Sequence, residues 1–344
     1  MEEIFLDKNE NLYGPAPKCL EVLRSIGSAE LSMYSRDYIR GVKSSLTERL
    51  AQDLGIPEKQ ILLSDGSEDM LKQAVHCYIR RGEKILCPAE SWWYYQAVAS
   101  EVGGVTVKYH LKETKDRFYY DIDELISLYK QESPRAILIG SPNNPTGNSI
   151  DDIELQKLIE GCPESIIMLD EAYWGFADEA VEHITKYFQS YHNILVIRSF
   201  SKYYALAGAR IAYAIAGKGI TQLANYASHY LGYNRLSEAL ALAALDSTDY
   251  YERITSKLKQ DRKKFYDFFD RFPGFQCYRS DANFVLVRVP QGFIESMQKA
   301  LQDCGIIIKF FSEVECNNSI RITIGTQHQN DKLLNIIQSV LTSI

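Results

Sequence analysis

Short apolar runs alternate with helix-like stretches between residues 61 and 216, and this alternation restricts the possible folds more than any other feature. The runs occupy 61–64, 84–87, 105–109, 136–140, 166–169, 194–198 and 211–216. Continuous apolar runs of this length are typical of strands that are covered on both faces. Strands that alternate with helices form mostly parallel sheets. The sequence therefore predicts an α/β fold with a mostly parallel, seven-stranded sheet.

The C-terminal part of the chain has a different pattern. Apolar residues recur at helical spacing from Leu236 through about Arg271, which predicts one long helix. Strands near 284–289, 306–310 and 320–324 and helices at 293–304 and 328–342 should follow it and form a smaller α+β unit. A chain of 344 residues also exceeds the usual size of a single core, so two domains are expected. The polar stretch from Lys112 to Asp121 predicts an exposed loop.

The composition argues against several functions. A net charge of −7 and a pI near 5.5 disfavour nucleic acids and anionic membranes as partners. The start of the chain has no basic segment followed by an apolar one, and no apolar run approaches transmembrane length. The seven cysteines include no Cys-x-x-Cys pair, which is typical of reduced thiols in a cytoplasmic protein. The six histidines are scattered, so no metal site is predicted.

One lysine follows a predicted strand in a suggestive context. The segment Ser199-Phe200-Ser201-Lys202 comes after the run 194–198, and Arg210 lies eight residues beyond the lysine. Ligands of α/β enzymes bind at such strand ends. Two hydroxyls and a guanidinium suit a dianionic phosphate, and a lysine can form an imine with an aldehyde. The group that combines a phosphate with an aldehyde is pyridoxal 5′-phosphate (PLP), although a lone motif of this length also fits a solvated surface lysine.

Other strand ends carry residues that suit the same cofactor. Asp170 ends the run 166–169 and could pair with a protonated pyridine nitrogen, which favours the ionised carboxylate. Tyr173, just beyond it, could reach the phenolic oxygen of the ring, and Asn144 could donate to the same oxygen. The turn 65–68 precedes a predicted helix, whose first N–H groups can bind an anion. Each feature alone also fits an ordinary strand end, turn or helix cap.

In combination and order, these motifs resemble fold-type I PLP-dependent aminotransferases, and within that superfamily the histidinol-phosphate aminotransferase branch. The resemblance covers nearly the whole chain and includes the opening Asn9-Glu10-Asn11-Leu12-Tyr13-Gly14. It also rests on Gly66-Ser67-Glu68, the aromatic run 92–95, the segments 141–147, 170–173, 199–202 and 207–210, and Ile320-Arg321-Ile322-Thr323-Ile324-Gly325. The resemblance implies an N-terminal arm or small-domain segment at 1–32, a large PLP-binding domain at 33–237 and a small C-terminal domain at 238–344.

The resemblance also implies roles for individual residues. Lys202 would hold the cofactor covalently and shuttle a proton, Asp170, Tyr173 and Asn144 would hold the ring, and Trp92 would stack on it. The cofactor phosphate would be bound by Ser67, Glu68, Ser199, Ser201, Arg210 and, from a second subunit, Tyr34. Arg321 would clamp the substrate carboxylate, with Asn144, Tyr13 and Lys309 also contacting the substrate. The implied protein is a cytoplasmic homodimer of amino-acid biosynthesis that acts on a small amino donor and a 2-oxo acid.

The substrate is less well determined than the cofactor. Where the resembling branch has an arginine that grips the substrate phosphate, this chain has Lys309 followed by Phe310 and Phe311. Lysine binds phosphate as a point charge rather than as a planar fork. Histidinol phosphate or a related phosphorylated amine is the leading donor, and an aromatic amino acid is a second candidate. A decarboxylase resembling threonine-phosphate decarboxylase, or a non-enzymatic PLP-binding regulatory domain, would also carry the cofactor motifs.

Overall fold

Two β-sheets organise the chain. The computed structural model describes residues 3–177, 190–229, 231–312 and 316–342. The larger sheet has seven strands in the order β2-β10-β9-β8-β7-β3-β4. These are β2 (Ile61–Ser64), β3 (Lys84–Pro88), β4 (Val105–Tyr109), β7 (Ala136–Gly140), β8 (Ile166–Glu171), β9 (Ile194–Ser199) and β10 (Ala212–Ala216). Only β10 runs in the direction opposite to the other six strands of this sheet, which confirms the predicted mostly parallel α/β architecture.

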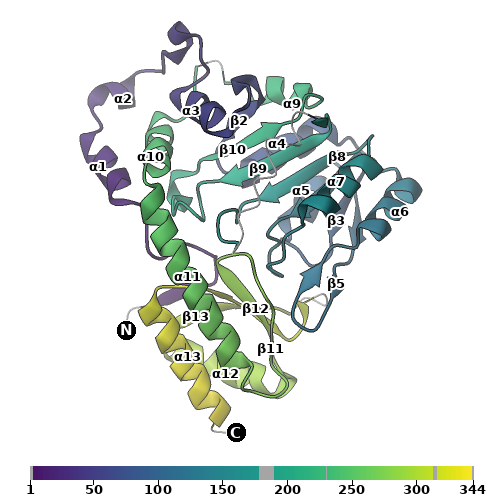
Figure 1. Ribbon diagram of the computed structural model, residues 1–344, viewed down its shortest axis with the longest axis vertical. Coiled ribbons are helices and arrows are strands. Elements are labelled where there is room, and N and C mark those ends of the chain that lie inside the picture. The colour runs from purple at the N-terminus through teal and green to yellow at the C-terminus, as the bar shows by residue number, and fades with distance from the viewer. Residues whose placement is uncertain (1–2, 178–189, 230, 313–315, 343–344) are drawn as a thin grey trace.

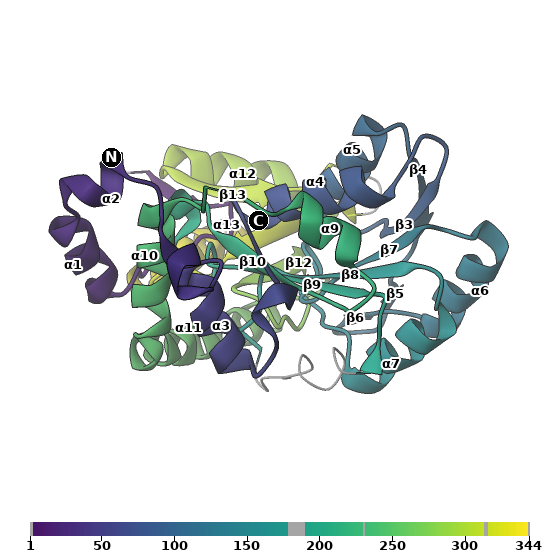
Figure 2. The same cartoon turned by 90° about the horizontal axis from the view of Figure 1, so that it is seen from above.

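Helices cover both faces of the larger sheet, as Figure 2 shows. One layer contains α3 (Ser45–Leu54), α6 (Ile122–Glu132) and α7 (Asp152–Gly161), and the other contains α4 (Ser67–Tyr78), α5 (Tyr94–Glu101) and α9 (Thr221–Tyr226). Successive residues of a strand point to opposite faces. In β8, Ile167 and Leu169 accordingly join one core and Met168 joins the other. Burial on both sides explains why the strands are apolar throughout rather than at alternate positions.

The smaller sheet lies below the larger one in Figure 1 and has the strand order β1-β13-β14-β12-β11. Its strands are β1 (Ile4–Leu6), β11 (Gln276–Cys277), β12 (Phe284–Arg288), β13 (Ile306–Phe310) and β14 (Ser319–Thr323), and α12 (Ile294–Asp303) and α13 (Gln327–Thr342) pack on it. Strand β1 pairs in parallel with β13, so the N-terminal segment belongs to this sheet. The chain then passes along the gap between the sheets before it enters α1 (Pro17–Ser25). The domain boundaries at 32/33 and 237/238 stay predictions.

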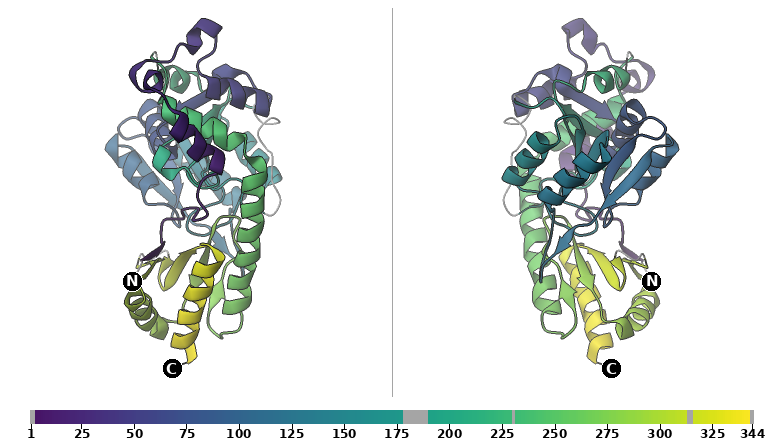
Figure 3. Two further views of the ribbon diagram at one scale, coloured as in Figure 1. Left: turned by 90° about the vertical axis from the view of Figure 1, so that its left-hand side faces the viewer. Right: turned by 90° about the vertical axis from the view of Figure 1, so that its right-hand side faces the viewer.

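The prediction of one long helix from Leu236 to about Arg271 was wrong. The segment forms α10 (Arg235–Leu245) and α11 (Thr248–Phe269), which are separated at Asp246 and Ser247. The Asp246 carboxylate binds Lys18 and Arg49 at 2.7 and 2.5 Å, so it is held toward neighbouring helices. Asp and Ser also compete with the helix for backbone hydrogen bonds. Helix α11 then runs from the larger sheet down to the smaller one (Figure 3).

The stretch from Lys112 to Asp121 is also more structured than predicted. It contains a two-stranded ribbon of β5 (Lys112–Glu113) and β6 (Phe118–Tyr119), and the side chains of Phe118 and Tyr120 are buried. The Tyr120 hydroxyl donates to the carbonyl of Gly140 at the end of β7. The remaining short helices are α2 (Ser28–Ser32), η1 (Asp37–Arg40), η2 (Glu58–Gln60), η3 (Ala207–Ala209) and η4 (Gln291–Phe293). None of the helices in the described part of the chain has the length and hydropathy that crossing a membrane requires.

Candidate active site

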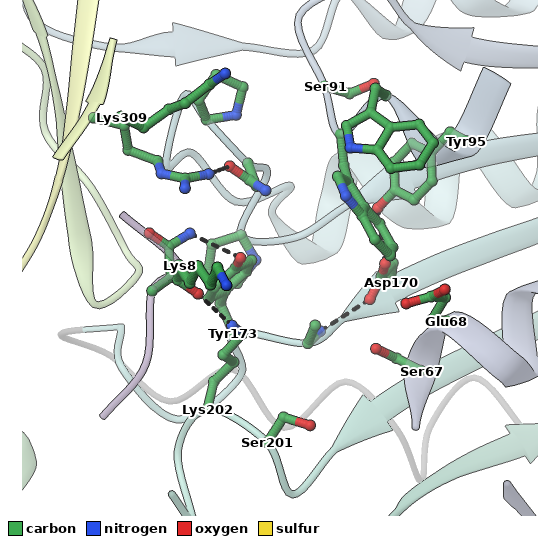
Figure 4. Close-up of a pocket in the computed structure, with 18 of the residues that line it drawn as sticks. Lys8, Ser67, Glu68, Ser91, Tyr95, Asp170, Tyr173, Ser201, Lys202 and Lys309 are labelled. Carbon is green, nitrogen blue, oxygen red and sulfur yellow. Dashed lines mark hydrogen bonds between the residues drawn. The ribbon is translucent and has the colours of Figure 1, made fainter. Parts of the chain in front are cut away.

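A cavity of about 590 Å³ lies where the ends of β7, β8 and β9 face the smaller sheet. The carboxyl ends of parallel strands meet at one edge of a sheet, so residues that are distant in sequence converge there. Figure 4 shows Ser67, Glu68 and Ser201 at one end of this cavity and Lys309 toward the other. The predicted site residues that line it are Ser67, Glu68, Trp92, Asn144, Asp170, Tyr173, Ser199, Ser201, Lys202, Arg210, Lys309 and Arg321.

One end of the cavity is built to accept an anion. Helix α4 begins at Ser67, and the first N–H groups of a helix have no partner within it. Gly66 precedes the helix with φ +103°, and a Cβ at this position would overlap the Arg210 guanidinium, with its carbon only 2.9 Å away. Glycine is therefore needed here both for the backbone conformation and for the approach of the arginine. The hydroxyls of Ser199 and Ser201 line the same cavity.

Asp170 is a buried carboxylate near the end of β8. Its two oxygens accept hydrogen bonds from the Tyr95 hydroxyl at 2.8 Å and from the backbone N–H of Ala172 at 3.0 Å. Both donors are neutral, and burial raises the pKa of Asp170 to about 6 in spite of them. A cation placed beside this carboxylate would favour its ionised form and lower its pKa again. The side chain is therefore suited to a positively charged ligand group.

Tyr95 is a residue of this cavity whose contact the sequence does not reveal. Its hydroxyl lies within the cavity wall and donates to Asp170, and its side chain is only 4% exposed. The sequence alone favours interface or half-buried packing for this tyrosine. A partial signal exists, because Tyr95 lies only three residues after Trp92, the predicted stacking residue, and a buried tyrosine hydroxyl needs a polar partner. The indole of Trp92 packs edge-on against this tyrosine, with ring centroids 5.9 Å apart.

Lys202 lies just beyond β9 with its amine in the cavity. The Nζ atom donates to the carbonyl oxygen of Lys8 at 2.6 Å, and it lies 5.9 Å from the centre of the Tyr173 ring. Burial, together with the charges of Arg321 and Arg210, lowers the pKa of Lys202 to about 8. A larger share of this lysine is therefore neutral near pH 7 than of an ordinary lysine. A neutral amine is the form that can attack a carbonyl group.

Arg321 extends from β14 of the smaller sheet into the same cavity. Its guanidinium donates to the side-chain oxygen of Asn144 and to the carbonyl of Asp7. The Nε atom is buried without a hydrogen-bond partner among the described residues. Burial lowers the pKa of Arg321 below its ordinary value, although an arginine stays charged. Each terminal nitrogen of the guanidinium carries two hydrogens and uses one in these contacts, so the group has donor capacity left for an anionic ligand.

Two predicted site residues lie outside this cavity. Tyr34 follows α2 and is 68% exposed on the surface of the chain. Tyr13 lines a separate hollow with Lys257, whose amine lies 5.6 Å from the centre of the tyrosine ring. Their predicted contacts, with a second subunit's cofactor and with the substrate, stay predictions. Lys309, by contrast, lines the cavity from β13.

Comparison with known proteins agrees with this arrangement. The family model for "Aminotransferase class I and II" matches residues 2–337. A histidinol-phosphate aminotransferase of Ruminiclostridium cellulolyticum is 29% identical over 342 residues, which cover 98% of this chain and 92% of that protein. Histidinol-phosphate aminotransferase 1 of Arabidopsis thaliana, a chloroplastic protein, is 29% identical over 97% of this chain and 77% of its own length.

A solved structure is similar over the same extent. The histidinol-phosphate aminotransferase of Sinorhizobium meliloti, determined in complex with pyridoxal 5′-phosphate, superposes with a TM-score of 0.87 at 25% sequence identity. The match covers 99% of this chain and 91% of that one. A likeness of this extent includes both sheets.

Proposed function

Because the chain belongs to the class I and II aminotransferase family, and is thus a PLP-dependent transaminase, we propose that its amino donor is histidinol phosphate or a closely related phosphorylated amine and that its acceptor is a 2-oxo acid. The observation that carries the proposal is a single cavity with an anion cradle at one end and Arg321 and Lys309 at the other. The named relatives are histidinol-phosphate aminotransferases, which supports the same donor. A decarboxylase or a regulatory domain has no comparable support from the family match.

The residues present fit PLP. The cradle formed by Gly66, Arg210 and the start of α4 suits a phosphate, because it combines a guanidinium with free helix N–H groups. The buried carboxylate of Asp170 suits a protonated pyridine nitrogen. Burial raises the pKa of this carboxyl group, and the positive charge of the nitrogen would lower it again. We propose that Ser67, Glu68, Ser199, Ser201 and Arg210 hold the phosphate, and that Asp170, Tyr173, Asn144 and Trp92 hold the ring.

When bound, PLP supplies an electron sink for the charge that remains after a proton leaves the α-carbon of the donor. The protein's own part is to hold the reactants and to move that proton. We propose that Lys202 Nζ binds the cofactor aldehyde and transfers the proton at the α-carbon, because its lowered pKa keeps a neutral amine accessible near neutral pH. Arg321 would hold the carboxylate of the 2-oxo acid through the guanidinium hydrogens that its contacts with Asn144 and Asp7 leave over. The two guanidinium contacts to Asn144 and Asp7 fix the direction of this arginine.

Lys309 provides the test of the substrate. Replacing Lys309 with methionine keeps the aliphatic stem and removes the charge, so KM for histidinol phosphate should rise about 10- to 100-fold, the value of one charge-assisted contact. KM for unphosphorylated histidinol should change little, because histidinol has no group that pairs with the ammonium. The measurement is kcat/KM for histidinol phosphate, histidinol, phosphoserine and phenylalanine on both proteins.

The matched control is Lys299→Met, which removes a lysine on α12 of the same sheet layer, outside the cavity. It should leave the KM of every donor unchanged. A wild-type preference for phenylalanine over histidinol phosphate would replace the proposed donor by an aromatic amino acid, with Phe310 and Phe311 as its contacts, and would leave the aminotransferase assignment intact.

We also propose a cytoplasmic homodimer whose two sites are shared. The segment from α1 to η1 exposes large apolar side chains that a second subunit could cover, namely Leu20, Leu23, Leu31, Met33, Tyr34, Tyr38 and Ile39. Tyr34 belongs to this group and is the residue expected to reach the cofactor phosphate of the partner subunit.

None of the seven cysteines, all of which lie within the described ranges, forms a disulfide, and this suits a reducing compartment.

Shared sites predict complementation between two defective proteins. In a hybrid dimer of Lys202→Ala and Tyr34→Ala subunits, one site retains both Lys202 and Tyr34, so random subunit exchange should restore roughly a quarter of wild-type activity. Activity is measured at limiting PLP after exchange has been verified by mass. Mixing Lys202→Ala with Asp170→Asn is the control, because both residues line the cavity of one chain and no intact site can form. If the first mixture recovers no more activity than the second, the sites are not shared.

A further inference from the structure

Asn9 occupies an unusual position between the two sheets. It follows β1, is 1% exposed, and has φ +55°, in the left-handed region that asparagine tolerates better than most residues. Its backbone N–H donates to Thr323 Oγ1 at 2.9 Å, and its carbonyl accepts from Asn283 Nδ2 at 3.0 Å. Its side-chain Nδ2 donates to the hydroxyl oxygen of Tyr173 at 2.9 Å. The backbone is thus anchored to the smaller sheet, while the side chain reaches a residue at the end of β8.

Thr323 determines which way the Asn9 amide points. The Thr323 hydroxyl accepts the backbone N–H of Asn9 and lies 3.2 Å from Asn9 Oδ1, to which it can give its own hydrogen. With the amide reversed, that hydroxyl hydrogen would face an NH₂ group, which cannot accept it. The orientation with Oδ1 toward Thr323 and Nδ2 toward Tyr173 therefore gives both contacts of the Asn9 amide one donor and one acceptor.

This arrangement has a consequence for the Tyr173 hydroxyl. Its oxygen already accepts a hydrogen bond from Asn9, so its one hydrogen is directed away from Asn9. Tyr173 and Asn9 both line the cavity that contains Lys202. The tyrosine is thereby presented to a ligand as a donor rather than as an acceptor.

We propose that Asn9 is a positioning residue that holds Tyr173 as a hydrogen-bond donor toward the phenolic oxygen of bound PLP. The proposal rests on the function proposed above, in which Tyr173 contacts the cofactor ring. It also connects the cofactor to the substrate side of the site. Arg321 lines the cavity, and Thr323, which bonds to Asn9, lies on the same face of β14. A change in the position of β14 when Arg321 binds a carboxylate would reach Tyr173 through Thr323 and Asn9.

The spectroscopic pKa of the bound cofactor tests the proposal without relying on activity. A donor to the phenolic oxygen stabilises its ionised form and so lowers the pKa that is read from the cofactor absorbance. In the Asn9→Asp holoenzyme the new carboxylate can only accept, so the Tyr173 hydrogen is drawn to it and the cofactor loses its donor. The spectroscopic pKa should rise by about one unit, the size expected for one hydrogen bond to a charged group.

Three further variants make the result decisive. Asn9→Gly tolerates the positive φ and removes the amide without adding charge, so it should raise the spectroscopic pKa by a smaller amount. Tyr173→Phe should raise it at least as much as Asn9→Asp. Asn11→Asp is the matched control, because the Asn11 amide donates to the carbonyl of Tyr203 outside the cavity, and it should leave the spectroscopic pKa unchanged.

Coupling between the two positions separates a positioning role from a direct charge effect. If Asn9 acts through Tyr173, the shift caused by Asn9→Asp must be clearly smaller in the Tyr173→Phe background. Two outcomes would overturn the positioning role and leave the proposed function standing. One is an equal shift of the spectroscopic pKa in both backgrounds, and the other is a shift in Tyr173→Phe with none in either Asn9 variant. If Tyr173→Phe itself causes no shift, then the proposed contact of Tyr173 with the cofactor fails, and the inference fails with it.

Discussion

The Lys202→Ala protein is expected to lose transamination by about 10⁴-fold or more, together with the covalent attachment of PLP that borohydride reduction makes permanent. The size of the loss reflects the removal of both the attachment point and the positioned proton-transfer group. Half-reactions followed by absorbance measure the first effect, and intact-protein and peptide mass spectrometry after reduction measure the second. In the wild type, the modified peptide should contain Lys202.

Three other lysines of the cavity, Lys8, Lys108 and Lys309, are the competing attachment points. The structure favours Lys202 because burial and two neighbouring guanidinium groups lower its pKa to about 8, whereas Lys8 faces Lys202 through its main-chain carbonyl. At pH 7 a pKa of 8 leaves a neutral fraction about 300-fold larger than a pKa of 10.5 does. A reduced adduct on Lys8, Lys108 or Lys309 in the Lys202→Ala protein, with turnover retained, would contradict the assignment.

The convergence of Asn144, Asp170 and Lys202 could be predicted from the sequence for a physical reason. Each follows or ends a continuous apolar run, and such runs become neighbouring parallel strands whose carboxyl ends share one edge. Their proximity then depends only on the strand order and not on details of side-chain packing. The anion-binding end of the site could be predicted in a similar way, from the turn at Gly66 before a helix. The structure adds that a Cβ at Gly66 would overlap the Arg210 side chain.

Other parts of the site depend on geometry that short-range patterns do not encode. Tyr94 and Tyr95 look equivalent in the sequence, and only the direction in which α5 begins places the Tyr95 hydroxyl on Asp170. The path of the N-terminal motif depends on the pairing of β1 with β13, which brings Asn9 to the cavity and takes Tyr13 to another hollow. The break between α10 and α11 likewise depends on the ion pairs of Asp246, whose partners lie far away in the sequence.

Asp170→Asn is the second substitution with a large expected effect, and its effects on rate and on stability should have opposite signs. Asparagine keeps the shape of the side chain and can still bond to Tyr95, whose hydroxyl can donate or accept. It cannot balance a protonated pyridine nitrogen, so kcat should fall about 10²- to 10³-fold, as for the loss of one preorganised electrostatic contact. Stopped-flow absorbance of single half-reactions measures this loss.

The apo-protein should become more stable at neutral pH. Burial raises the pKa of Asp170 to about 6 in the folded chain, above its ordinary value of 3.8, so the folded state favours the protonated carboxyl. This contribution to stability is fully present below pH 3.8 and is lost as the pH rises through 6, where the buried group must ionise. Asparagine never ionises, so the apo Asp170→Asn protein should unfold at a higher temperature than the wild type at pH 8, and this difference should disappear near pH 4.

Glu171→Gln is the matched control for this prediction, because Glu171 is the adjacent carboxylate of β8 and is equally buried. It accepts from Arg198 at 2.7 Å in a buried ion pair, and the Arg198 guanidinium also lies 4.0 Å from the centre of the Trp174 ring. Removing one partner of such a pair leaves a buried charge without compensation, so Glu171→Gln should lower the unfolding temperature at pH 8. A loss of rate with a gain in apo stability in Asp170→Asn would show that this carboxylate serves the cofactor. A loss of stability in Glu171→Gln would show that the adjacent carboxylate serves the fold. An unchanged kcat in Asp170→Asn would instead mean that Asp170 is an ordinary strand end.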